Sequence, residues 1–114
     1  MKAYERFLNY AKVPTMSDEE SESCPSTEKQ LILAKALKDE LLALGLSDAR
    51  VDKDGYVYAT LPANTDKEVN ASGLVAHMDT SPDASGADVK ARIVEYTGED
   101  IQLNEEKDIW LPRK

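Results

Sequence analysis

Cysteine is almost missing from this sequence, since Cys24 is the single one among 114 residues. No disulfide can form within the chain, so its stability does not depend on such a cross-link. The first residues, from Met1 to Arg6, lack the apolar segment of a secretory signal peptide. We therefore expect a cytoplasmic protein.

Long apolar runs and basic clusters are missing as well. The uninterrupted apolar stretches are only a few residues long, as at 74–76, whereas a membrane-spanning helix needs about 20. Acidic residues outnumber basic ones by 22 to 14, and the net charge is −8. The basic residues are scattered, while phosphate binding needs a concentrated basic surface. We expect neither a membrane nor a nucleic acid as partner.

The composition is otherwise that of a folded protein, with 41% hydrophobic and 32% charged residues. Such a balance argues against disorder of the whole chain. The length allows one domain at most, and a compact chain of this size buries about two-thirds of its unfolded surface. We expect the chain to fold or to be part of something that folds.

Two segments repeat apolar residues at helical spacing. The pattern predicts a short amphipathic helix with a face to bury over residues 2–12 and a longer helix over residues 27–44. A hydroxyl of the Ser26-Thr27 pair is available to cap the second helix, and Gly45 suits a left-handed residue at its end. The acidic stretch between the helices, residues 15–26, is predicted to be a loop.

The second half of the sequence indicates β-structure. Asp54-Gly55 is a hairpin turn signal within residues 51–61, and the apolar run 73–78 fits a buried strand. Residues 91–96 fit a further short strand, whereas residues 101–114 show no turn or cap that would close a domain. The predicted order is helix, helix, hairpin and core strand.

His77, the only histidine, ends the apolar run and is followed two residues later by Asp79. Side chains two apart along a strand point the same way, so the imidazole could bind zinc while the carboxylate holds its other nitrogen. By itself a His-x-Asp triplet is weak, because a lone histidine near a strand end is more often structural. A zinc site also needs three or four protein ligands, so further ligands from this chain would have to be carboxylates.

Four separated blocks carry a more specific signal: residues 5–10 (ERFLNY), 24–28 (CPSTE), 59–64 (ATLPAN) and 77–83 (HMDTSPD). In this order they closely resemble the beginning of peptidase T, a family of cytoplasmic bacterial tripeptide aminopeptidases. The resemblance runs along essentially the whole chain but covers only the opening part of the family's chain.

The resemblance implies an α/β fold, the N-terminal part of a three-layer α/β/α zinc-peptidase catalytic domain with a mixed sheet. Residues 1–114 would be an incomplete portion of that domain, without the family's lid domain. It further implies a site for two zinc ions, with His77 as a metal ligand and Asp79 as the supporting aspartate counted among the catalytic residues. The family's other ligands and its general-base glutamate have no counterpart here, so we expect the chain alone to be inactive.

Two functions follow as expectations. The chain is either part of a zinc-dependent aminopeptidase, in which zinc-activated water attacks tripeptide substrates, or a non-catalytic binding or assembly module on the same scaffold. In the second case a partner would satisfy its unpaired sheet edges. Related peptidases dimerise often enough to make a homo-oligomer a further expectation.

Overall fold

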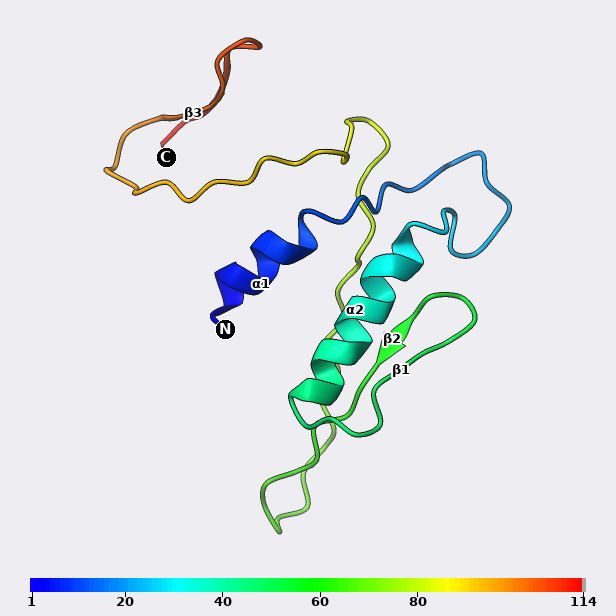
Figure 1. The fold of residues 1–114 in the computed structure, drawn as a ribbon. Coiled ribbons are helices and arrows are strands. Elements are labelled where there is room, and N and C mark those ends of the chain that lie inside the picture. Colours follow the sequence, from blue (N-terminus) through cyan, green and yellow to red (C-terminus); the bar gives the residue numbers. More distant parts are fainter. Residues whose placement is uncertain (114) are drawn as a thin grey trace.

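The structure, a computed structural model, describes residues 1–113 and contains two helices and two small antiparallel sheets (Figure 1). The elements are α1 (Ala3–Tyr10), α2 (Gln30–Ala43), β1 (Arg50–Val51), β2 (Val57–Tyr58), β3 (Ile101–Asn104) and β4 (Ile109–Leu111). This mixture of helix and strand is compatible with the predicted α/β class. The strands form two separate pairs, β1 with β2 and β3 with β4.

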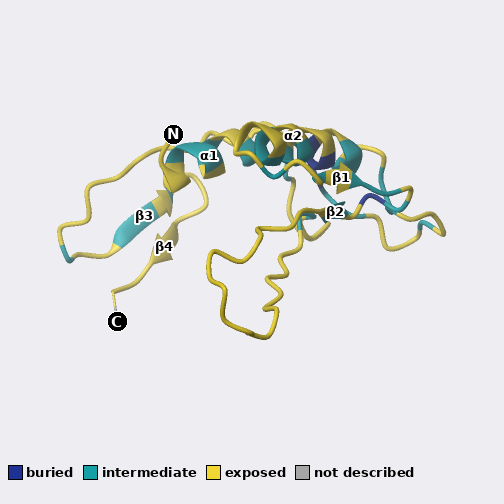
Figure 2. Cartoon of the chain, turned by 90° about the horizontal axis from the view of Figure 1, so that it is seen from below, coloured by how far each residue is buried: buried dark blue, intermediate teal, exposed yellow. Residues whose placement is uncertain are grey.

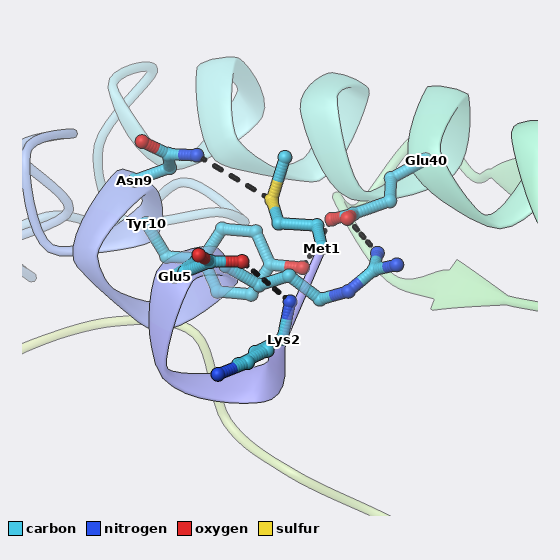
Figure 3. A network of polar contacts seen from close by, with 7 residues as sticks. Met1, Lys2, Glu5, Asn9, Tyr10 and Glu40 are labelled. Atoms are coloured by element: carbon cyan, nitrogen blue, oxygen red, sulfur yellow. Dashed lines mark hydrogen bonds and ion pairs between the residues drawn. The ribbon is translucent and has the colours of Figure 1, made fainter.

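Helix α1 forms within the predicted range and is fastened to α2 by polar contacts. Glu40 of α2 accepts hydrogen bonds from the Arg6 guanidinium and the Tyr10 hydroxyl. Figure 3 shows Tyr10 and its neighbours on α1 gathered next to α2, with Glu40 reaching down to them. The apolar face of α1 stays largely open, since none of its residues is buried and Phe7 is 66% exposed.

The start of α2 differs from the prediction. The helix begins at Gln30, and no side chain caps it. The Ser26 hydroxyl instead accepts a hydrogen bond from the Asp18 N–H at 3.1 Å, and the Thr27 hydroxyl donates to the Met16 carbonyl at 2.9 Å. The predicted cap is therefore wrong, because both hydroxyls bind the loop that precedes the helix.

The end of α2 is as predicted. Gly45 has a φ of +93°, the left-handed conformation that a residue without a Cβ adopts readily. Its N–H bonds to the Leu42 carbonyl at 3.0 Å, and the N–H of Leu46 bonds to the Leu41 carbonyl at 3.1 Å. This pair of bonds is the Schellman arrangement, which satisfies carbonyls left free at a helix end.

The predicted hairpin is present and packs on α2. Strands β1 and β2 pair in antiparallel register, with Arg50 opposite Tyr58, and the turn contains Gly55 at a φ of +87°. A Cβ at Gly55 would lie 3.3 Å from Leu31 Cδ2 and 3.4 Å from Pro25 Cγ. The small core lies on the same helix, where Leu33 and Ala34 of α2 are 6% and 1% exposed.

Both strands predicted after the hairpin are wrong for the described structure. Residues 73–78 and 91–96 form no strand, and Leu74 and Val75 are 100% and 99% exposed. A strand exists only where a neighbouring strand accepts and donates its backbone hydrogen bonds. Within residues 1–113, no strand is hydrogen-bonded to either segment.

The segment predicted to lack a turn contains one. Strands β3 and β4 pair with Gln102 opposite Trp110, and Asp108 adopts a φ of +50° in the connection. The Asn104 side chain accepts a hydrogen bond from the Lys107 N–H at 2.8 Å, which closes the turn. Asn and Asp favour such turns, and this signal was available in the sequence.

The chain is open in shape. Its radius of gyration is 17.8 Å, against about 13 Å for a compact domain of this length. Its accessible area is 9923 Å², against about 6,200 Å² for a folded protein of this mass. Figure 2 shows that most of the ribbon is exposed and that burial concentrates at α2. Within the described residues, no helix combines the length and apolarity needed to cross a membrane.

Candidate functional site

His77 and Asp79 form a hydrogen-bonded pair, although they lie in an irregular segment rather than at the end of a strand. His77 Nδ1 and Asp79 Oδ1 are 3.0 Å apart, and the two side chains are 84% and 40% exposed. A carboxylate at Nδ1 favours the tautomer that carries its proton there, which leaves the lone pair of Nε2 free for a metal. The structure thus brings together the two residues that the sequence singled out.

The pair is followed directly by an anchored residue, Thr80. The Thr80 N–H donates to the Thr15 carbonyl at 3.1 Å, and the Thr80 carbonyl accepts from the Ser17 N–H at 2.9 Å. Met16 and Thr80 therefore form a parallel bridge. Thr15 is only 3% exposed, so the bridge begins at one of the few buried positions of the chain.

A cavity of about 340 Å³ lies beside the pair. Its walls come from three segments: residues 24–26 with Gln30, residues 54–56, and residues 76–79. Pockets that bind small molecules have volumes of about 300–1,000 Å³, so the space suits a small ligand or one end of a short peptide. The Cys24 thiol, which lines the same cavity, donates to the Asp54 carbonyl at 3.7 Å and so joins the first two walls.

The described residues supply only part of a metal site. Among residues 1–113, no group of three or more histidine, cysteine, aspartate or glutamate side chains is placed to hold an ion. The imidazole of His77, held by a carboxylate, is a suitable zinc donor, but a catalytic zinc site takes about three protein ligands. The pair could supply one ligand of such a site, and other residues would have to supply the remaining ligands.

Sequence reasoning missed the other cavity walls. Gln30 and Tyr56 line the cavity only because the hairpin packs against α2, and no local pattern predicts that packing. A partial signal was present, since residues 24–28 form one of the blocks that carry the family resemblance. Asp83, by contrast, hydrogen-bonds with its neighbour Ser81 at 2.7 Å and is not among the cavity residues.

Curated relatives confirm the resemblance read from the four blocks. The chain is 59% identical over 108 residues to the peptidase T of Desulfitobacterium hafniense, and 58% identical over 108 residues to that of Clostridium botulinum strain Langeland. It is 55% identical over 107 residues to the peptidase T of Brevibacillus brevis. No protein-family model matches the chain.

These alignments cover nearly all of this chain but little of the relatives. They include 93–94% of the chain and 26% of each relative. The chain therefore spans about a quarter of the length of the curated relatives it matches.

Proposed function

We propose, from its similarity to peptidase T, that this chain is the N-terminal portion of the catalytic domain of a cytoplasmic zinc-dependent aminopeptidase that acts on tripeptides. The identity of 55–59% over nearly the whole chain supports this proposal. One structural observation links the proposal to particular residues. His77 Nδ1 lies 3.0 Å from Asp79 Oδ1, and the imidazole is 84% exposed beside a cavity.

In this proposal each residue of the pair has its own role. His77 holds zinc through Nε2, and Asp79 orients the ring and keeps the proton on Nδ1. Asp79 thus acts through the histidine. The metal, when bound, supplies a Lewis acid and an activated water for attack on a peptide bond. The walls at residues 24–26 and 54–56 border the space that one end of the substrate would occupy.

The proposal extends to the fold. A three-layer α/β/α domain with a mixed sheet would give residues 73–78 a strand neighbour and place His77 at the strand's carboxyl end, where open α/β sheets bind ligands. The chain alone should be inactive, since residues 1–113 contain no group of three potential metal donors. Its substrates would be tripeptides, and a homo-oligomer is compatible with the proposal.

The function is tested on the native protein, captured from its own cells with an antibody raised against residues 1–114. We expect an intact mass several times 12.6 kDa and release of the N-terminal residue from a tripeptide. A chelator should abolish the release and added zinc should restore it. His77→Ala in the native gene should lower kcat/KM by at least ~100-fold and reduce the zinc content, because a metal ligand is lost.

Asp79→Asn should be milder, lowering metal affinity about 10- to 100-fold, since it alters the support of the ligand rather than the ligand itself. Asp66→Asn is a suitable control, because this exposed carboxylate has no hydrogen-bond or ion-pair partner within residues 1–113. Unchanged zinc content after His77→Ala would exclude the assigned role.

One observation favours a second candidate, a non-catalytic binding or assembly module. The run 73–78 exposes unpaired backbone and apolar side chains, with Leu74 100% exposed. A partner that adds a strand to this run would form hydrogen bonds with its backbone and cover its apolar side chains. An intact mass near 12.6 kDa, together with stability indifferent to zinc and solubility that requires a copurifying protein, would favour this candidate.

A further inference from the structure

Among the described residues, the segment that carries His77 and Asp79 is hydrogen-bonded to the rest of the chain at one residue. Within residues 1–113, every hydrogen bond that joins residues 61–91 to the rest of the chain involves Thr80. Asp79 lies one residue before this attachment and His77 three residues before it. The position of the pair relative to the cavity walls therefore depends on what holds Thr80.

Thr80 is held by residues 15–17. Besides the two backbone hydrogen bonds of the bridge, the Ser17 hydroxyl donates to the Thr80 carbonyl at 3.2 Å. This contact joins residues 63 positions apart in the sequence. A serine hydroxyl in a loop usually bonds to backbone a few residues away, so this long-range bond is not explained by local turn formation.

Residues 15–17 are in turn held to the start of α2 by Thr27. Its hydroxyl donates to the Met16 carbonyl at 2.9 Å and accepts a hydrogen bond from Gln30 Nε2 at 3.3 Å. Thr27 lies two residues before Lys29, the N-cap residue of α2, and its hydroxyl donates across to another segment. The contacts thus run from α2 through Thr27, Met16 and Thr80 to the His77–Asp79 pair.

We propose that Thr27 and Ser17 are positioning residues for the His77–Asp79 pair. Thr27 fixes residues 15–17 on α2, and Ser17 fixes Thr80 on residues 15–17, so that the pair faces the walls at residues 24–26 and 54–56. Neither hydroxyl touches the imidazole or the space around it. The inference rests on the proposed function for what His77 binds, but the placement of the pair is measurable without a metal.

The first measurement is amide hydrogen exchange by NMR on the chain 1–114. Thr27→Val removes the hydroxyl while keeping the side-chain shape, and Thr27→Ser restores the donor. We expect Thr27→Val to speed amide exchange at Thr80 and Ser17 about three- to tenfold, because this is the effect of losing one hydrogen bond. Exchange of the α2 amides should stay unchanged. Thr27→Ser should behave like the native chain.

Thr65→Val is the matched control, because among the described residues the Thr65 hydroxyl accepts only from the Lys67 N–H, within the same segment. Exchange at Thr80 should be unaffected by it. The inference is overturned if Thr27→Val leaves Thr80 unchanged, or if it speeds exchange in α2 to the same degree, since the hydroxyl would then merely support the helix.

A second measurement reports the placement itself. In the native chain we expect nuclear Overhauser contacts between side chains of residues 76–79 and side chains of the walls at residues 24–26 and 54–56, because these segments line one cavity. Thr27→Val and Ser17→Ala should weaken these contacts, and Thr27→Ser should keep them. Contacts of full strength in both Thr27→Val and Ser17→Ala would overturn the inference even if exchange had changed.

Zinc separates this inference from the proposed function. If zinc binds, Thr27→Val should raise the apparent Kd about tenfold, as for other groups that support a ligand, and Thr27→Ser should not. An equal Kd for the native chain and Thr27→Val would overturn the inference. If added zinc leaves the His77 ring resonances of the native chain unchanged, the chain alone does not bind zinc. The hydrogen-exchange and Overhauser results then still decide the role of Thr27.

Discussion

At the scale of single residues, Asp48 connects the loop that follows α2 to Thr60, which follows strand β2. Its carboxylate accepts a hydrogen bond from the Thr60 N–H at 2.9 Å. The Thr60 side chain first, and this N–H second, lower the pKa of Asp48 below its ordinary value of 3.8. A lowered pKa in the folded state means that the contact stabilises the fold above the unfolded pKa and is lost as pH falls through the folded value. We expect the Thr60 amide resonance to shift only below about pH 4.

Asp48→Asn checks this expectation by NMR titration, because an amide keeps an acceptor oxygen but carries no titrating charge. The shift of the Thr60 amide at acid pH should disappear in this variant and persist in Asp66→Asn, an exposed site elsewhere in the chain. A Thr60 amide that titrates identically in Asp48→Asn would mean that another group causes the shift.

At the scale of elements, α1 depends on α2 for its existence. A helix of eight residues is marginal in water, and α1 buries none of its residues. Its contacts to Glu40 involve side chains that are about a quarter exposed, with Arg6 at 24% and Glu40 at 23%. We expect Glu40→Ala to destabilise the docking of α1 by about 1–2 kcal/mol, the range for partly buried bonds to a charged group.

The measurement is the exchange of α1 amides relative to α2 amides, which should rise selectively for α1. Asp39→Ala is the matched control, because Asp39 is 69% exposed on the same helix and, within residues 1–113, forms an ion pair only with its neighbour Lys38. Equal effects of the two substitutions would show that loss of a helical charge, rather than loss of the docking contacts, explains the result.

At the scale of the whole molecule, the open shape predicts association. The exposed run at residues 73–78 combines unpaired backbone with apolar side chains, and exposed strand-like edges of this kind recruit other chains. We expect the isolated chain to self-associate in sedimentation experiments at high concentration. Replacing Leu74 and Val75 by lysine should raise the protein concentration required for self-association on the order of tenfold, because the apolar contact between chains is lost.

Val69→Lys is the control, since Val69 is 61% exposed outside the apolar run and should change association little. A chain that stays monomeric at high concentration and unfolds in one cooperative transition would contradict the expectation. Such behaviour would show that the core around Leu33 and Ala34 is sufficient by itself.

Local signals allowed much of the fold, and the contact between His77 and Asp79, to be predicted. The periodicity of apolar residues predicted both helices to within three residues, and Gly45 and Gly55 predicted a helix end and a hairpin turn, because each signal acts between residues close in sequence. The resemblance to peptidase T and the His77–Asp79 pair were likewise readable from short blocks.

Tertiary structure decided what depends on distant residues. Residues 73–78 have the composition of a buried strand, yet a strand requires a neighbour, and none of the described residues provides one. A hydroxyl of the Ser26-Thr27 pair was predicted to cap the second helix, but the Thr27 hydroxyl donates to the Met16 carbonyl and the Ser26 hydroxyl accepts from the Asp18 N–H. The cavity beside His77 arises in the same way, because the hairpin packs on α2 and the Thr80 bridge places the pair beside it, and no local pattern encodes either contact.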